Sequence, residues 1–252
     1  MLKINQPTLF KKIPDGILFD TDNTLYPYDP AHLKAMSALK LKISNTLNVS
    51  EKDIEKNFNQ ARSEVKILLK NSAASHSRLL YIQRMLEFFG LGSQVLLALD
   101  FEQTYWRVFL SEAKLFSGLE KFLEELRLLQ LPIAIVTDLT AQIQFRKMVY
   151  FDIDHYFDYI VTSEEAGYDK PHRMPFEISL KKMNLNKKKD IWFIGDNPKN
   201  DIEGAKKHIN ATTLQKIHKG VTRATGRYQA DLEFTNYKDL TKVMNKIKQR
   251  HD

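Results

Sequence analysis

Two aspartates, Asp20 and Asp22, directly follow a short apolar run at 16–19. Side chains two residues apart in an extended segment point to the same side, so these two carboxylates are expected to lie close together. Such a pair is costly unless a cation lies between the carboxylates or one of them is protonated. The pair therefore predicts metal-dependent or acid–base chemistry, with an Asx-rich turn at the end of a buried strand as the alternative.

Thr137 and Asp138 follow a second apolar run at 133–136. A hydroxyl and free backbone N–H groups at such a turn can hold a phosphate oxygen. Thr and Asp are also ordinary helix N-caps, which is the alternative interpretation.

Lys170 stands before Pro171 ahead of an expected helix. Its ammonium group can neutralise a phosphate or a carboxylate there, unless it is a solvated surface lysine.

Asp196 follows Gly195 at the end of the apolar run 191–194, and Asp201 is expected in the first turn of the next helix. Glycine allows a close approach of the backbone at this point. A few carboxylates supplemented by water are the hard oxygen ligands that Mg²⁺ selects. This segment therefore predicts a magnesium site.

The apolar runs predict the elements that position these residues. They are short, lack alternation and are bounded by loop residues, which is typical of strands buried on both faces of a parallel sheet. The expected strands are 16–19, 133–136, 159–161, 191–194 and, more weakly, 211–214. The helix-like segments between the later strands are 118–130, 140–150, 174–184 and 199–208. This alternation predicts a doubly wound α/β fold.

Residues 31–113 interrupt the alternation, because they have the pattern of successive helices without a convincing strand. The expected helices are 31–47, 51–70, 76–89 and 94–111. We therefore expect an inserted all-helical domain, 29–113, between the segments 1–28 and 114–252 of the α/β core.

The order of these groups along the chain, two Asp, then Thr, then Lys, then two Asp, resembles the haloacid dehalogenase superfamily of phosphotransferases and hydrolases. The resemblance covers residues 15–240. A helical insertion directly after the first group resembles the subgroup that has a mobile cap domain in this position. The resemblance implies a Rossmann-like parallel sheet core with an inserted helical cap.

The resemblance also implies roles in phosphoryl transfer. Asp20 would be the nucleophile that becomes an aspartyl phosphate, and Asp22 would be the general acid and then the general base. Thr137, Asp138 and Lys170 would bind the phosphate. Asp138 stands where asparagine is frequent in the family, and it adds negative charge beside the phosphate.

The implied metal ion is Mg²⁺, held by Asp20, Asp22, Asp196 and Asp201, with Asp22 contributing its backbone carbonyl. Mg²⁺ and Lys170 must offset the repulsion between a carboxylate nucleophile and a phosphate dianion. The dehalogenases of the superfamily do not carry an acid at the position of Asp22, because a halide leaves without protonation. The presence of Asp22 therefore favours phosphoester chemistry.

Ser75, His76 and Arg78 form part of a polar break between two expected helices of the insertion. In cap-bearing relatives the corresponding loop often meets the substrate, so these residues are candidates for substrate specificity. The alternative is a plain helix N-cap at Ser75 with solvated neighbours.

The expected function is a Mg²⁺-dependent phosphatase that hydrolyses a small phosphorylated metabolite, a nucleoside monophosphate or a sugar phosphate, through an aspartyl phosphate. One alternative is a sugar-phosphate phosphomutase of the same fold. A less favoured one is a nucleic-acid binding protein, suggested by the net charge of +7. That excess lies in residues 181–252, with 17 Lys and Arg against 8 Asp and Glu, mostly outside the motifs. We therefore expect no nucleic-acid partner.

The chain has 252 residues and no cysteine, which excludes disulfides and thiolate metal sites. No apolar stretch approaches the roughly 18–20 residues that a membrane helix needs. We expect a cytoplasmic protein without a membrane partner, whose oligomeric state its sequence does not indicate.

Overall fold

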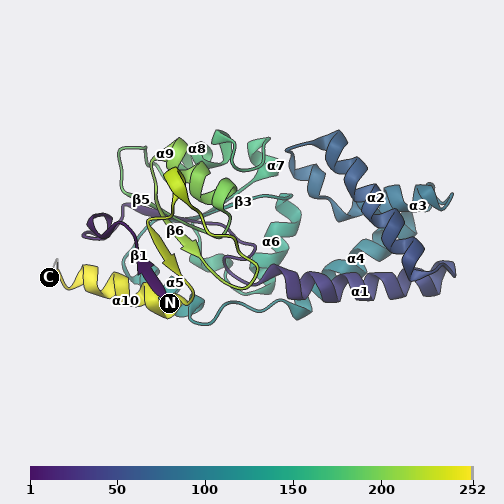
Figure 1. The fold of residues 1–252 in the computed structure, drawn as a ribbon, viewed down its shortest axis with the longest axis horizontal. Helices are drawn as coiled ribbons and strands as arrows, with labels where there is room; N and C mark the ends of the chain where they lie inside the picture. Colours follow the sequence, from purple (N-terminus) through teal and green to yellow (C-terminus); the bar gives the residue numbers. More distant parts are fainter. Residues whose placement is uncertain (251–252) are drawn as a thin grey trace. The chain divides into compact units, whose positions relative to one another are not determined.

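The computed structural model describes residues 1–250 and divides into two compact units (Figure 1). The first, called the α/β unit here, contains Met1–Pro27 and the chain from Lys114 onward. The second, the helical unit, is the continuous segment Tyr28–Ala113.

A seven-stranded sheet forms the centre of the α/β unit, with the strand order β1-β7-β6-β5-β2-β3-β4. All neighbouring strands are parallel except β1, which pairs antiparallel with β7. The strands are β1 (Leu2–Ile4), β2 (Gly16–Phe19), β3 (Ile133–Thr137), β4 (Tyr159–Thr162), β5 (Ile191–Gly195), β6 (Thr212–Lys216) and β7 (Leu232–Phe234). The predicted α/β fold with a mostly parallel sheet is thus confirmed.

Helices cover both faces of this sheet, which explains why β2, β3 and β5 are apolar without alternation. Leu18 and Phe193 belong to a buried cluster with the residues of α8 and α9. Phe19 points to the opposite face, where its ring packs against Phe122 of α5, and Phe122 in turn contacts Tyr237 of α10. The helices of this unit are α5 (Leu119–Leu128), α6 (Ala141–Tyr150), α7 (Ser163–Ala166), α8 (Arg173–Lys182), α9 (Gly204–Ile209) and α10 (Tyr237–Lys248).

The two strands β1 and β7 were not expected from the sequence. Each has only three residues, and all three residues of β1 are exposed, so neither strand produces a long apolar run. A second difference concerns the expected helix 199–208, which begins as a π-helical segment, Pro198–Glu203, before α9. Among the described residues, no helix combines the length and the apolar character that a membrane span requires.

The helical unit consists of α1 (Tyr28–Leu47), α2 (Glu51–Leu69), α3 (Arg78–Phe88) and α4 (Val95–Glu112). Helix α1 packs against α4, and α2 against α3. A 3₁₀ turn, Ala73–His76, precedes α3, and the N-cap of α3 is Ser77, whose hydroxyl accepts a bond from Leu80 N. The alternative of an N-cap at Ser75 is therefore wrong, because this 3₁₀ turn delays the start of the helix.

Helix α5 allows a matched test of the packing on the sheet. Leu126 is fully buried, whereas Leu128 is 76% exposed. Leu126→Ala should lower the free energy of unfolding by about 2–5 kcal/mol, because it leaves a cavity in the core. Leu128→Ala should change it by less than about 0.5 kcal/mol. Urea unfolding of both variants measures the difference, and equal effects would contradict the packing described.

Candidate active site

The site residues of the α/β unit follow the carboxyl ends of adjacent parallel strands. Phe19, the last residue of β2, is in register with Ile135 of β3 on one side and with Ile194 of β5 on the other. The backbone N–H of Asp20 continues the ladder by donating to Ile194 O at 2.9 Å. In open α/β sheets this edge is where ligands bind.

Lys170 lies at the centre of the site, and its side chain is almost completely buried. The Lys170 Nζ donates to Asp20 Oδ1 at 2.7 Å and to Asp201 Oδ1 at 2.6 Å. Although burial lowers the pKa of Lys170, the two carboxylates hold it above the ordinary value. The alternative of a solvated surface lysine is therefore wrong, because the ammonium group joins two segments that end different strands.

Asp201 has both carboxylate oxygens engaged. Its Oδ2 accepts bonds from the backbone N–H groups of Asp196 and Asn197, at 3.1 and 2.9 Å. This position requires glycine at 195, because a Cβ there would lie 2.6 Å from the Cβ and Cγ of Asp201. The close approach expected at Gly195 is thus made by the Asp201 side chain.

Asp20, Asp196 and Asp201 each present one carboxylate oxygen within 4.8 Å of the others. Burial raises the pKa of Asp196, and repulsion from Asp201 and Asp20 raises it further. Burial likewise raises the pKa of Asp20, although Lys170 opposes this. The Asp196 carboxylate has no hydrogen-bond or ion-pair partner among the residues that the structure describes. Three carboxylates converge at this place, and that of Asp196 is not engaged by another side chain of the described residues. Such a group of ligands fits a hard divalent cation such as Mg²⁺.

Thr137 is buried at the end of β3, and its hydroxyl belongs to a polar network. Thr137 Oγ1 lies 2.7 Å from Thr21 Oγ1 and accepts a bond from Gln144 Nε2 at 2.8 Å. Gln144 also donates to the carbonyl of Asp138 at 2.7 Å. This network holds the turn after β3, where the phosphate contact of Thr137 is predicted.

The Asp138 carboxylate supports the loop that carries Lys170. Asp138 Oδ1 accepts from the backbone N–H of Lys170 at 2.8 Å and from Ser163 Oγ at 3.0 Å. The negative charge of Asp138 beside the predicted phosphate site thus holds the Lys170 loop in place. The predicted phosphate contact of Asp138 therefore depends on its backbone N–H, since a carboxylate would repel a phosphate.

Asp22 is held by two side chains that sequence reasoning missed. Lys147 Nζ donates to Asp22 Oδ1 at 2.8 Å although the Lys147 side chain is 99% buried, and the hydroxyl of Tyr26 donates to the same oxygen. The signal for Lys147 was available, because it lies with Ile143 and Met148 on the buried face of the amphipathic helix α6. A lysine in such a position needs a partner anion.

The remaining candidates, Ser75, His76 and Arg78, belong to the helical unit. Ser75 is buried, and its carbonyl accepts a bond from the hydroxyl of Tyr81. Arg78 opens α3 and donates to His76 O at 2.8 Å. Their contact with a substrate stays a prediction.

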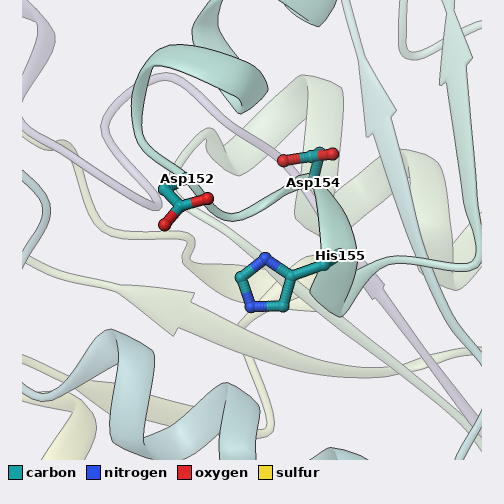
Figure 2. A group of neighbouring side chains, drawn as sticks. All are labelled: Asp152, Asp154 and His155. Carbon is teal, nitrogen blue, oxygen red and sulfur yellow. The ribbon is translucent and has the colours of Figure 1, made fainter.

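A second group of potential metal ligands, Asp152, Asp154 and His155, follows α6 (Figure 2). All three are exposed, and the His155 ring lies against Tyr156. Exposed acidic groups of this kind are common without an ion. Nothing else at this place in the described chain points to a ligand, and we assign it no function.

A parallel sheet with an aspartate pair after β2, a buried lysine and a further aspartate pair after β5 defines a Rossmann-like hydrolase core. The family model of the haloacid dehalogenase-like hydrolases matches residues 17–215. The chain belongs to this family, as its motifs predicted.

Two curated relatives match the chain along almost their whole length. It is 32% identical over 242 residues to ribulose-1,5-bisphosphate 5-phosphatase of Halopiger xanaduensis, covering 91% of this chain and 99% of the relative. It is 28% identical over 233 residues to glyceraldehyde 3-phosphate phosphatase of Methanocaldococcus jannaschii, covering 90% and 91%. These relatives are phosphoric monoester hydrolases, which is the enzyme class expected from the sequence.

Solved structures share the fold. A 2-haloacid dehalogenase from Pseudomonas syringae aligns with a TM-score of 0.74 at 20% identity, covering 93% of this chain and 99% of the other. A phosphatase of the same superfamily from Thermococcus onnurineus aligns with a TM-score of 0.69, also at 20% identity, covering 91% and 97%. At this identity the likeness establishes the fold alone.

The contact between Gly195 and Asp201 can be tested directly. Gly195→Ala should lower the free energy of unfolding by about 1–3 kcal/mol, because the added methyl group overlaps the Asp201 side chain. Gly92→Ala is the control, since the tightest contact of its methyl group would be with the flexible Glu87 side chain, with Cγ at 3.1 Å, while the Glu87 Cα lies at an ordinary 3.9 Å. Chemical denaturation compares the two variants, and an unchanged stability of Gly195→Ala would show that Asp201 does not need this space.

Proposed function

We propose that this protein is a Mg²⁺-dependent phosphatase that hydrolyses a small phosphorylated sugar through an aspartyl phosphate. The observation that carries the proposal is the ion-paired arrangement of Asp20, Lys170 and Asp201 with Asp22 two residues from Asp20. It combines a carboxylate nucleophile, a cation for the phosphate and a separate acid–base group.

Asp20 is the proposed nucleophile. One of its carboxylate oxygens attacks phosphorus, the bond from phosphorus to the sugar oxygen breaks, and an aspartyl phosphate forms. Lys170, 2.7 Å from Asp20 Oδ1, offsets the charge that builds up on the phosphoryl oxygens. Thr24 Oγ1 donates to Asp20 Oδ2 at 3.1 Å and orients the carboxylate.

Asp22 is the proposed acid and base. It donates a proton to the leaving sugar oxygen and then accepts one from the water that hydrolyses the aspartyl phosphate. Proton transfer by a positioned group contributes about 10²–10⁴ in rate. Lys147 and Tyr26 hold the Asp22 carboxylate in one orientation, which serves both steps.

Asp20, Asp196 and Asp201, with the backbone carbonyl of Asp22, are the proposed Mg²⁺ ligands. When bound, the ion supplies positive charge that reduces the repulsion between a carboxylate and a phosphate dianion. In this chain Lys170 supplies only one positive charge among these carboxylates, which supports the need for a cation.

The relatives narrow the substrate class. Their names specify a bisphosphorylated ketopentose and a phosphorylated triose, which favours a sugar phosphate over a nucleoside monophosphate. The helical unit, inserted after the first motif, is proposed to act as the cap that selects the substrate and excludes water. Ser75, His76 and Arg78 are its predicted specificity residues.

The test of this proposal is release of inorganic phosphate from a panel of sugar phosphates and nucleoside monophosphates, with Mg²⁺ and with a chelator. We expect release from sugar phosphates in Mg²⁺ and its loss on chelation. Asp20→Asn should abolish release while the cooperative unfolding transition is retained. Isomerised sugar phosphate without free phosphate would indicate a mutase, and an active Asp20→Asn variant would refute the mechanism.

The proposed dual role of Asp22 as acid and base predicts a pre-steady-state burst of product in the variant Asp22→Asn. In Asp22→Asn, p-nitrophenyl phosphate should release p-nitrophenolate stoichiometrically, because this leaving group needs no proton. Steady-state turnover should then fall by about 10²–10⁴, because the aspartyl phosphate lacks its base. Stopped-flow absorbance measures both phases, and Asp154→Asn, an exposed aspartate of the same unit, serves as control. Full steady-state turnover without a burst would remove Asp22 from this role.

A further inference from the structure

The helical unit has a cavity of its own, about 360 Å³ in volume, which opens to solvent. This volume is at the lower end of the roughly 300–1,000 Å³ found for small-molecule sites. The cavity is lined by residues of α1, α2 and α3: Tyr28, Asp29, His32, Leu33, Met36, Lys40, Glu55, Phe58, Asn59, Arg62, Arg78 and Tyr81. Polar and charged side chains form most of this wall, and three of them, Glu55, Asn59 and Arg62, are exposed side chains of α2.

Arg78 is the central cation of this cavity, and it has no carboxylate partner among the described residues. Its guanidinium donates to His76 O and to the hydroxyl of Tyr28. Its Cζ lies 5.5 Å from the ring centre of Tyr105 and 5.8 Å from that of Trp106. A partly buried guanidinium held by rings and neutral oxygens retains donors for an anion.

Arg62 provides a second positive charge on the cavity wall, again without a carboxylate partner in the described chain. Burial lowers the pKa of His32 to about 4, and the charges of Arg78 and Arg62 act in the same direction. His32 is therefore neutral near pH 7, and its Nδ1 lies 2.7 Å from the Tyr105 hydroxyl.

The acidic residues of the wall do not cancel this charge. Glu55 is paired with Lys40 at 3.2 Å, which leaves the exposed Asp29 as the remaining carboxylate against Arg62 and Arg78. In addition, Arg78 is the first residue of α3, an eleven-residue helix whose N-terminal dipole favours anions.

We propose that this cavity is a binding site for a phosphate monoester dianion, held by the guanidinium groups of Arg78 and Arg62. Arginine forks match phosphate oxygens in a bidentate manner, and the Tyr28 hydroxyl lies beside the Arg78 fork. Two sources share this chemistry: a second phosphate of a bisphosphorylated substrate, and a separate phosphorylated ligand. The binding itself does not depend on the proposed phosphatase activity.

The direct test is a titration of the full-length protein with inorganic phosphate, followed by NMR of the arginine Nε–H groups. The Arg78 signal should shift in a saturable manner. Arg62→Gln should weaken this binding about tenfold or more, and because Arg62 is exposed, the variant should fold. Arg107→Gln removes the same charge from an exposed position of α4 outside the cavity and should leave the binding unchanged.

An Arg78 signal that does not respond to phosphate, or equal effects of Arg62→Gln and Arg107→Gln, would overturn the proposal. The phosphate titration needs no catalysis, so its outcome is independent of the proposed function.

A second arm separates the two sources, and this arm does rest on the proposed function. If the site takes a second substrate phosphate, Arg62→Gln should raise KM about tenfold for ribulose 1,5-bisphosphate but not for glyceraldehyde 3-phosphate. If it takes a separate ligand, added phosphate should change the rates on both sugars alike, and Arg62→Gln should abolish that response. Either result supports the site, and the absence of both would contradict its use by the enzyme.

Discussion

The buried ion pairs of Lys170 are the interaction on which the α/β site depends. Burying one ammonium and two carboxylates is costly unless each charge is paired and its remaining donors and acceptors are satisfied. Asp138 holds the Lys170 backbone, and the Asp196 and Asn197 amides satisfy the second oxygen of Asp201. The Asp138 bond thus connects the Lys170 loop to the end of β3, and the two amide bonds hold Asp201 within the segment that follows β5.

The same arrangement leaves an excess of negative charge, because Asp20, Asp196 and Asp201 surround the single ammonium group of Lys170. One ammonium group cannot neutralise three converging carboxylates, which explains why burial and repulsion raise the pKa of Asp196. This excess is the physical basis of the proposal that a divalent cation binds here together with an anionic substrate. The Asp22 carboxylate has partners of its own, Lys147 and Tyr26, which hold it in place for the proton transfer proposed for it.

In the helical unit, aromatic residues gather around a partly buried cation, Arg78. Tyr105 and Trp106 of α4 are both buried. Their rings also surround the Arg78 guanidinium, and the Tyr105 hydroxyl contacts His32. These aromatic residues thus belong to the hydrophobic core and also hold the arginine that lines the cavity.

The sequence by itself determined the parallel sheet, the inserted helices and the aspartates, threonine and lysine at the strand ends, because apolar runs and adjacent motifs are local patterns. It did not reveal β1 and β7, which are short and gain their stability from pairing with each other across the length of the chain. Nor did it reveal the roles of Gln144 and Lys147. Lys147 bonds Asp22, which is 125 positions away in the sequence. The Asp138 carboxylate bonds the backbone N–H of Lys170. Only the tertiary structure decided these pairings, because a buried polar group must be matched by whichever partner the fold brings within hydrogen-bond distance.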